Sequence, residues 1–170
     1  QVKFAQTIYS AGNDLLTLIN DILDLSKIEA GKLDVRPEDV PLRRMSDDLV
    51  DAFHSLAREK GLELAISIAG DAPATLHTDS TRLQQILKNL LSNAFKFTEQ
   101  GSVRVDVAKA AAGWSADNAA LSAAETVIAL SVSDTGVGIA QDKLLLIFEA
   151  FQQADGTTSR RYGGTGLGLS

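Results

Sequence analysis

Apolar positions in the first thirty residues recur every seven residues and predict one long helix. Ile8, Leu15 and Ile22 form one row of this heptad, and neighbouring apolar residues widen the stripe beyond the seam of a two-stranded coiled coil. A broad stripe suits a helix of a four-helix bundle, and an amphipathic helix packed on its own domain is the alternative. Gly31 is placed to end the helix.

Beyond residue 31 the pattern changes to short segments. We expect strands at about 33–40, 62–68, 74–77, 103–107 and 126–134, and helices at about 41–60, 80–98 and 142–148. The alanine-rich stretch 109–124 is weakly patterned, and we interpret it as a loop. Because strands and helices do not alternate regularly, the order favours an α+β fold in two layers over a β-α-β fold.

The predicted helix after residue 79 has two asparagines and a lysine on one face. Asn89 and Asn93 are four residues apart, and Lys96 follows about one turn later. The opposite face is apolar and consists of Ile86, Leu87, Leu90, Leu91 and Ala94. Burying an amide without a partner costs about 1–3 kcal/mol, so we expect a polar partner, and a Mg²⁺ and phosphate site fits. The alternative is that the asparagines cap a neighbouring loop.

Two glycine motifs follow further along the chain. Asp134 ends an apolar strand and opens a turn with Gly136 and Gly138. A carboxylate in this place can accept a hydrogen bond from the exocyclic amine of adenine, and the glycines allow the backbone to approach a ring closely. Taken alone, an Asp-x-Gly-x-Gly pattern is more often a simple turn.

The second glycine motif lies at the end of the sequence. Its glycines, Gly164, Gly166 and Gly168, are typical of a loop whose N–H groups bind phosphate. No Lys-Ser/Thr pair closes the motif, so it is not a Walker A loop, and no strand precedes it as in a Rossmann fingerprint. A flexible linker is the alternative for the glycine run alone.

Four segments in this order resemble the motif boxes of the sensor histidine kinases of two-component systems. They are Gln85–Thr98 (the N box), Asp134–Ile139 (the first glycine box), Phe148–Phe151 (the F box) and Gly163–Ser170 (the second glycine box). The superfamily of these kinases also includes gyrase and MutL. For residues 32–170 the resemblance implies the Bergerat (GHKL) ATP-binding fold, a two-layer α/β sandwich that is incomplete at its C-terminal end. For residues 1–31 it implies the second helix of a dimerisation domain, which forms a four-helix bundle in a homodimer.

The resemblance also implies roles for individual residues. Asn93 would coordinate Mg²⁺ on the triphosphate of ATP, with Asn89 nearby and Lys96 at phosphate or ribose oxygens. Asp134 would contact the adenine amino group, and the segment 151–162 would be the ATP lid. The nucleotide-binding residues implied in this way are Asn89, Asn93, Lys96, Asp134, Gly136, Gly138, Phe151, Tyr162, Gly164, Thr165, Gly166, Leu167 and Gly168.

The residue at position 89 separates the branches of this superfamily. In the gyrase and MutL relatives a glutamate at this position activates water, and an amide cannot act as a general base. The resemblance therefore implies a histidine kinase that transfers the γ-phosphoryl group of ATP to a histidine, with a response-regulator aspartate as the next acceptor. The alternatives are a non-catalytic nucleotide-binding or dimerisation module of the same fold and an ATP-driven clamp of the gyrase kind.

Histidine content limits the expected activity. The chain contains only His54 and His77, and neither lies in the sequence context of a phospho-acceptor. We therefore interpret both as structural or surface residues. We expect that this chain does not autophosphorylate by itself.

Composition and charge exclude some partners. The net charge of −6 argues against sequence-independent nucleic-acid binding, and the chain has no cysteine for disulfides or thiolate metal sites. No apolar run approaches the ~20 residues that span a bilayer, so we expect a cytoplasmic kinase region and membrane attachment only through segments outside this chain. The sequence begins within a helical pattern and stops at a glycine motif, and we expect it to be a fragment.

Overall fold

The computed structural model describes residues 2–148 of the 170-residue chain. The chain divides into two compact units, residues 36–138 and a second unit that combines residues 1–35 with 139–170. The larger unit contains all of the N box and all but the last residue of the first glycine box. The described part therefore includes one half of the motifs that the sequence singled out.

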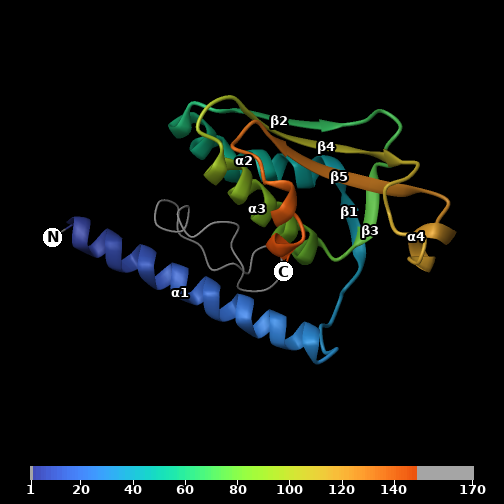
Figure 1. Ribbon diagram of the computed structural model, residues 1–170, viewed down its shortest axis with the longest axis horizontal. Coiled ribbons are helices and arrows are strands. Elements are labelled where there is room, and N and C mark those ends of the chain that lie inside the picture. Colours follow the sequence, from blue (N-terminus) through green and yellow to red (C-terminus); the bar gives the residue numbers. More distant parts are fainter. Residues whose placement is uncertain (1, 149–170) are drawn as a thin grey trace. The chain divides into compact units, whose positions relative to one another are not determined.

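The predicted N-terminal helix is α1, Val2–Glu29 (Figure 1). It ends at Gly31, whose φ of +62° is the left-handed conformation that favours glycine. The amide of Gly31 donates to the carbonyl of Ile28, and the amide of Lys32 donates to that of Lys27, which is a Schellman ending. Among the side chains of this helix that the structure describes, these large apolar ones are exposed: Phe4, Ile8, Leu15, Leu16, Ile19, Ile22, Leu23 and Ile28.

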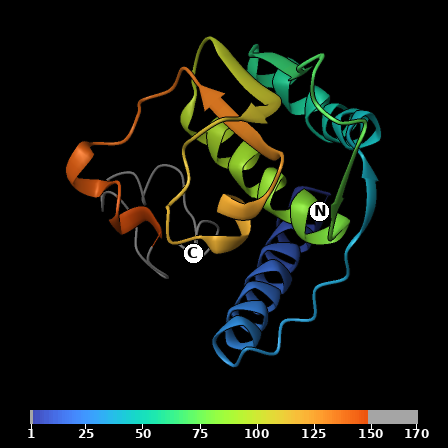
Figure 2. The ribbon, with the colours of Figure 1, turned by 90° about the vertical axis from the view of Figure 1, so that its right-hand side faces the viewer.

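The larger unit contains two sheets and two long helices, as predicted for an α+β fold. Strands β2, β4 and β5 form one sheet in that order, with β2 parallel and β5 antiparallel to the central β4. Strands β1 and β3 pair antiparallel in a separate two-stranded sheet (Figure 2). The bounds are β1 Glu38–Pro41, α2 Leu42–Lys60, β2 Glu63–Ile68, β3 Thr75–Thr78, α3 Ser80–Phe97, β4 Ser102–Ala110, α4 Ala119–Ala123 and β5 Val127–Asp134.

The core lies between the three-stranded sheet and the helices α2 and α3, which both cover one face of that sheet (Figure 1). The alternation of β4 buries Val103, Val105 and Val107 toward the helices and leaves Arg104 exposed on the other side. The buried apolar residues that the helices contribute are Leu42, Met45, Leu49, Phe53, Ala57, Leu87, Leu91, Ala94 and Phe95. This arrangement confirms the predicted two-layer sandwich.

Three of the predicted elements differ from the structure. The strand expected at 33–40 begins only at Glu38, after Pro37, because proline has no amide to donate and the amide of Arg36 donates instead to the Asp79 carboxylate at 2.9 Å. The loop 109–124 contains the short helix α4, whose first turn is capped by the Asn118 side chain. The helix expected at 142–148 is two separate 3₁₀ turns, η1 Gln141–Lys143 and η2 Leu146–Phe148.

Two apolar side chains are also more exposed than predicted. Ile86 was expected on the buried face of α3 and is 57% exposed, because the buried stripe follows Leu87 and Leu91 and one helical residue turns about 100° away from it. Phe148 is a large aromatic residue, for which core packing is the ordinary expectation, and it is 61% exposed at the end of the second 3₁₀ turn.

Candidate nucleotide-binding site

Helix α3 carries Asn89, Asn93 and Lys96, which together are called the asparagine face. The helix begins after Asp79, which caps it. The Asp79 carboxylate accepts hydrogen bonds from the backbone amide of Arg36 at 2.9 Å and from that of Arg82 at 3.0 Å. These two bonds stabilise the charged form, so they hold the pKa of Asp79 below its usual value. Asp79 is thus the N-cap residue of α3.

The two asparagines flank the buried stripe of this helix. Asn89 and Asn93 are both half-buried, whereas Leu91 and Ala94 beside them are buried in the core. Within residues 2–148 neither carboxamide forms a hydrogen bond, and no side-chain polar atom that is fully buried there lacks a partner. In the described part of the chain the asparagines therefore do not cap a loop, and their amide groups are accessible to a ligand.

Lys96 follows the asparagines in the last turn of α3. It is half-buried, and desolvation lowers the pKa of its ammonium group below the usual value. The ammonium lies 5.1 Å from the centre of the Phe97 ring, a cation–π contact that offsets part of the cost of burial. A partly desolvated cation of this kind favours an anionic ligand.

The Asp134 carboxylate presents one of its two oxygens to the surroundings. Oδ1 accepts hydrogen bonds from the backbone amide of Gly136 at 2.8 Å and from the hydroxyl of Thr98 at 3.4 Å. Thr98 is 0% exposed, so its hydroxyl is fixed in place at the end of α3. In the described structure Oδ2 accepts no hydrogen bond, and it is available for a donor such as an exocyclic amine.

The turn after Asp134 packs directly against the end of α3. A Cβ on Gly136 would lie 2.4 Å from the carbonyl oxygen of Phe97 and 2.8 Å from Asp134 Oδ1, so no side chain fits there. The amide of Val137 donates to the same Phe97 carbonyl at 3.3 Å. The sequence suggested that this glycine allows close approach to a ring, and the structure shows a close approach to the protein's own backbone. Gly138 has a φ of +68° and open space around it.

Three further residues organise this region, and sequence reasoning did not identify them. Besides Thr98, they are Thr135 and Lys60. The hydroxyl of Thr135 accepts from the amide of Ser102 at 3.0 Å and donates to the carbonyl of Gln100 at 3.2 Å, which ties β5 to the loop after α3. Lys60, at the end of α2, donates to the carbonyl of Phe95 in α3. The only signal in the sequence is that Thr98 lies in the N box and Thr135 in the first glycine box, although neither was among the predicted nucleotide-binding residues.

The structure thus brings the N box and the first glycine box into contact through Thr98 and Asp134 and through Phe97 and Val137. The other predicted site residues lie outside the described residues: Phe151, Tyr162, Gly164, Thr165, Gly166, Leu167 and Gly168. Among residues 2–148 no three His, Cys, Asp or Glu side chains cluster as a metal site would require.

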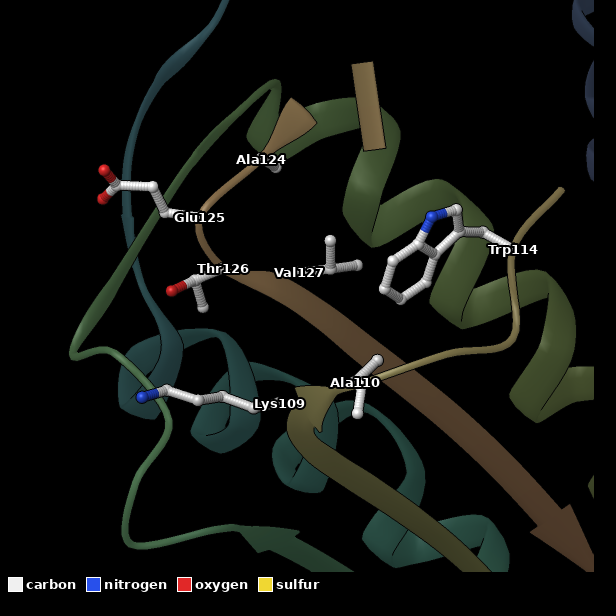
Figure 3. Close-up of a pocket in the computed structure, with 8 residues that line it drawn as sticks. Lys109, Ala110, Trp114, Ala124, Glu125, Thr126 and Val127 are labelled. Atoms are coloured by element: carbon white, nitrogen blue, oxygen red, sulfur yellow. The ribbon is translucent and has the colours of Figure 1, made fainter. Parts of the chain in front are cut away.

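A separate hollow of about 340 Å³ lies at the other end of the β4–β5 pair (Figure 3). Trp114, Lys109 and Glu125 line it together with small residues of both strands. In the register of the two strands Ala110 is opposite Val127, seven residues before Asp134 along β5. The hollow therefore does not include the asparagine face or the turn after Asp134.

The two histidines lie on other surfaces of the larger unit. His54 is exposed on α2, and His77 on β3 pairs with Asp39 of β1 through an Nδ1–Oδ1 contact of 2.9 Å. Both placements agree with the interpretation of these residues as surface residues.

Comparison with known proteins identifies the family. Residues 78–170 match the family model described as histidine kinase-, DNA gyrase B-, and HSP90-like ATPase, so this chain belongs to that family. The chain is 44% identical over 163 residues to the signal transduction histidine-protein kinase BarA of Escherichia coli K12, a match that covers 96% of the chain and 17% of BarA. The chain therefore spans about a sixth of this curated relative.

Solved structures of histidine kinases share the fold. The crystal structure of full-length ShkA in complex with AMPPNP superposes with a TM-score of 0.77 at 31% identity, over 99% of this chain and 32% of ShkA. ThkA in complex with the response regulator protein TrrA superposes with a TM-score of 0.59 at 17% identity, over 83% of this chain and 38% of that chain, which shows the fold alone. These neighbours confirm the GHKL fold predicted from the four boxes.

No helix among residues 2–148 combines the length and the apolar character that crossing a bilayer requires.

Proposed function

We propose that residues 32–170 are the ATP-binding catalytic domain of a histidine kinase, which binds magnesium–ATP and transfers its γ-phosphoryl group to a histidine. One observation supports this most strongly. The Asn89 and Asn93 carboxamides on α3, and Asp134 Oδ2 in the turn that contacts the end of α3, have no hydrogen-bond partner within the described chain. These groups form no hydrogen bonds within the described fold, so they are available to bind a nucleotide.

Asp134 would recognise the adenine base through a hydrogen bond. Its Oδ1 is already bonded to Thr98 and Gly136, so the carboxylate is held in one orientation with Oδ2 as the acceptor for the adenine amino group. Guanine carries a carbonyl oxygen at the corresponding position, which would face the carboxylate as a second acceptor. The arrangement therefore favours adenine over guanine.

The asparagine face suits a magnesium ion that arrives with the triphosphate. Mg²⁺ is commonly held by one or two protein oxygens together with water and substrate phosphates, and it does not need a cluster of carboxylates. The Asn93 carboxamide would supply the protein oxygen, with Asn89 beside it and the Lys96 ammonium at phosphate or ribose oxygens. When bound, the ion neutralises charge on the phosphates.

The remaining nucleotide contacts would come from the C-terminal motifs. Phe151 and Tyr162 bound the segment that resembles the ATP lid. Gly164, Thr165, Gly166, Leu167 and Gly168 would hold the phosphates through backbone N–H groups. The match of the family model through residue 170 supports the assignment of this segment to the same domain.

Asn89 favours phosphoryl transfer over hydrolysis, because a carboxamide cannot take a proton from water as a glutamate can. The acceptor histidine would be supplied by a dimerisation domain, of which residues 1–31 are the second helix. The exposed apolar side chains of α1 would be covered in a four-helix bundle of a homodimer. A response-regulator receiver domain would then take the phosphoryl group, and the kinase region would be cytoplasmic.

A transfer experiment tests the proposal. The chain is mixed with a separate helical hairpin that carries an acceptor histidine, together with magnesium and ATP labelled at the γ-phosphate. We expect the label on the hairpin histidine, and Asn93→Ala serves as the inactive control. Nucleotide binding without transfer would indicate a non-catalytic module, and steady hydrolysis without the hairpin would indicate an ATPase. Either result contradicts the proposal.

A further inference from the structure

Lys60, the last residue of α2, contacts the end of the other core helix. Its Nζ donates a hydrogen bond of 2.5 Å to the backbone carbonyl oxygen of Phe95. Phe95 lies in the last turn of α3, where carbonyl groups have no amide partner within the helix. The Lys60 ammonium therefore satisfies one of these carbonyls and offsets the negative partial charge at this helix end.

The same face of α2 holds Phe95 at a second point. Lys60 follows Phe53 by seven residues, which is about two helical turns, so both side chains lie on one face of α2. The Phe53 ring stacks on the Phe95 ring with a centroid separation of 5.5 Å and an interplanar angle of 6°. Helix α2 thus fixes Phe95 through its ring and through its carbonyl group.

Two residues of the predicted site lie in or beside this last turn of α3. Asn93 precedes Phe95 by two residues, and Lys96 follows it directly. On the other side, the Phe97 carbonyl accepts from the amide of Val137 in the first glycine box. The end of α3 is therefore held from two directions, by Lys60 of α2 and by the turn after β5.

We infer that Lys60 is a positioning residue for the phosphate and metal side of the nucleotide site. It holds the last turn of α3 so that Asn93 and Lys96 can meet the triphosphate, and it neutralises a carbonyl that would otherwise repel phosphate oxygens. The inference rests on the proposed function, because it assigns to Lys60 a part in the same site. It also predicts that adenine recognition, which depends on Asp134 and Thr98, needs Lys60 much less.

Three variants test this role. Lys60→Met keeps most of the aliphatic stem and removes the donor, and Lys60→Arg restores a charged donor. Arg58→Met is the matched control, because Arg58 is exposed in the same last turn of α2 and its side chain forms no hydrogen bond among residues 2–148. If Lys60→Met does not fold, as judged by thermal unfolding, Lys60→Ala, which also removes the donor, takes its place with the same expectations.

The measurements are calorimetric titrations with magnesium–AMPPNP and with adenosine. We expect Lys60→Met to bind magnesium–AMPPNP about five- to tenfold more weakly and adenosine less than about twofold more weakly. Lys60→Arg should recover most of the affinity, and Arg58→Met should bind as the unsubstituted chain does. Amide hydrogen exchange should be faster in Lys60→Met at Thr98, whose N–H bonds to Ala94 in this turn.

Three results would overturn the inference: an unchanged affinity of Lys60→Met for magnesium–AMPPNP, an equal loss in Arg58→Met, or an equal loss for adenosine. The last would indicate general damage to the fold. If the unsubstituted chain binds neither magnesium–AMPPNP nor adenosine, the proposed function is contradicted as well. If the unsubstituted chain binds both ligands and Lys60→Met binds them equally well, only the inference about Lys60 is contradicted.

Discussion

The two faces of α3 show how one helix serves the fold and a ligand at once. One face buries Leu87, Leu91 and Phe95 in the core, where each side chain is 1% exposed or less. The other carries Asn89 and Asn93, which are half-buried and form no hydrogen bond within the described chain. Substitutions on this helix can therefore separate stability from binding, because the two faces depend on different partners.

The largest expected effect is on the buried face. Leu91→Ala removes a side chain that is 0% exposed, and leaving a cavity between α3 and the sheet should lower the free energy of unfolding by about 2–5 kcal/mol. Urea denaturation followed by circular dichroism measures this change in the free energy of unfolding. Ile86→Ala is the control on the same helix, and with its exposed side chain it should cost much less. Equal losses in the two variants would contradict the assignment of the buried face.

The turn that packs against α3 should show an intermediate effect. Gly136→Ala places a Cβ 2.4 Å from the Phe97 carbonyl oxygen, so the turn must shift, and we expect a loss of about 1–3 kcal/mol together with weaker nucleotide binding. Gly70→Ala is the control, because a Cβ there meets nothing within 4 Å. Chemical unfolding measures the stability of both variants, and titration with nucleotide measures their affinity. Wild-type stability and binding in Gly136→Ala would contradict the close packing.

A smaller effect should appear at the start of the helix and depend on pH. The pKa of Asp79 is lower in the folded chain, so its contribution to stability is present above the unfolded pKa near 3.8 and is lost as pH falls through the folded pKa. Asp79→Asn should therefore be less stable than the unsubstituted chain at neutral pH, with the difference shrinking below about pH 3.8.

Chemical unfolding of both chains across this pH range measures the difference. Asp71→Asn is the control, because Asp71 is exposed and forms no hydrogen bond among residues 2–148. A stability difference at Asp79 that stays constant with pH would mean that the charge of its carboxylate does not stabilise the helix start.

The sequence predicted best what depends on local pattern. The approximate bounds of α2 and α3 follow from the spacing of apolar residues, and the end of α1 at Gly31 follows from the left-handed conformation that glycine adopts at a helix end. The family followed from the order of the four boxes, and the family model confirms it.

The contacts between segments distant in the sequence were not predictable in the same way. Lys60 reaches a carbonyl 35 residues away and Thr98 reaches a carboxylate 36 residues away, and neither pairing leaves a periodic signal. The prediction that Ile86 is buried was wrong for a different reason. Apolar character alone does not show whether a helical residue lies within the buried stripe or beside it. The roles of Asn89, Asn93, Lys96, Asp134 and the C-terminal glycines stay predictions.

The most direct test of the binding face is a titration of Asn93→Ala and the unsubstituted chain with AMPPNP, with and without magnesium. We expect magnesium-dependent binding by the unsubstituted chain and a loss of affinity of at least about tenfold in Asn93→Ala. The free energy of unfolding should stay within about 0.5 kcal/mol, because the side chain contributes no hydrogen bond to the described fold. Undiminished magnesium-dependent binding in Asn93→Ala would contradict the assignment of this face to the nucleotide.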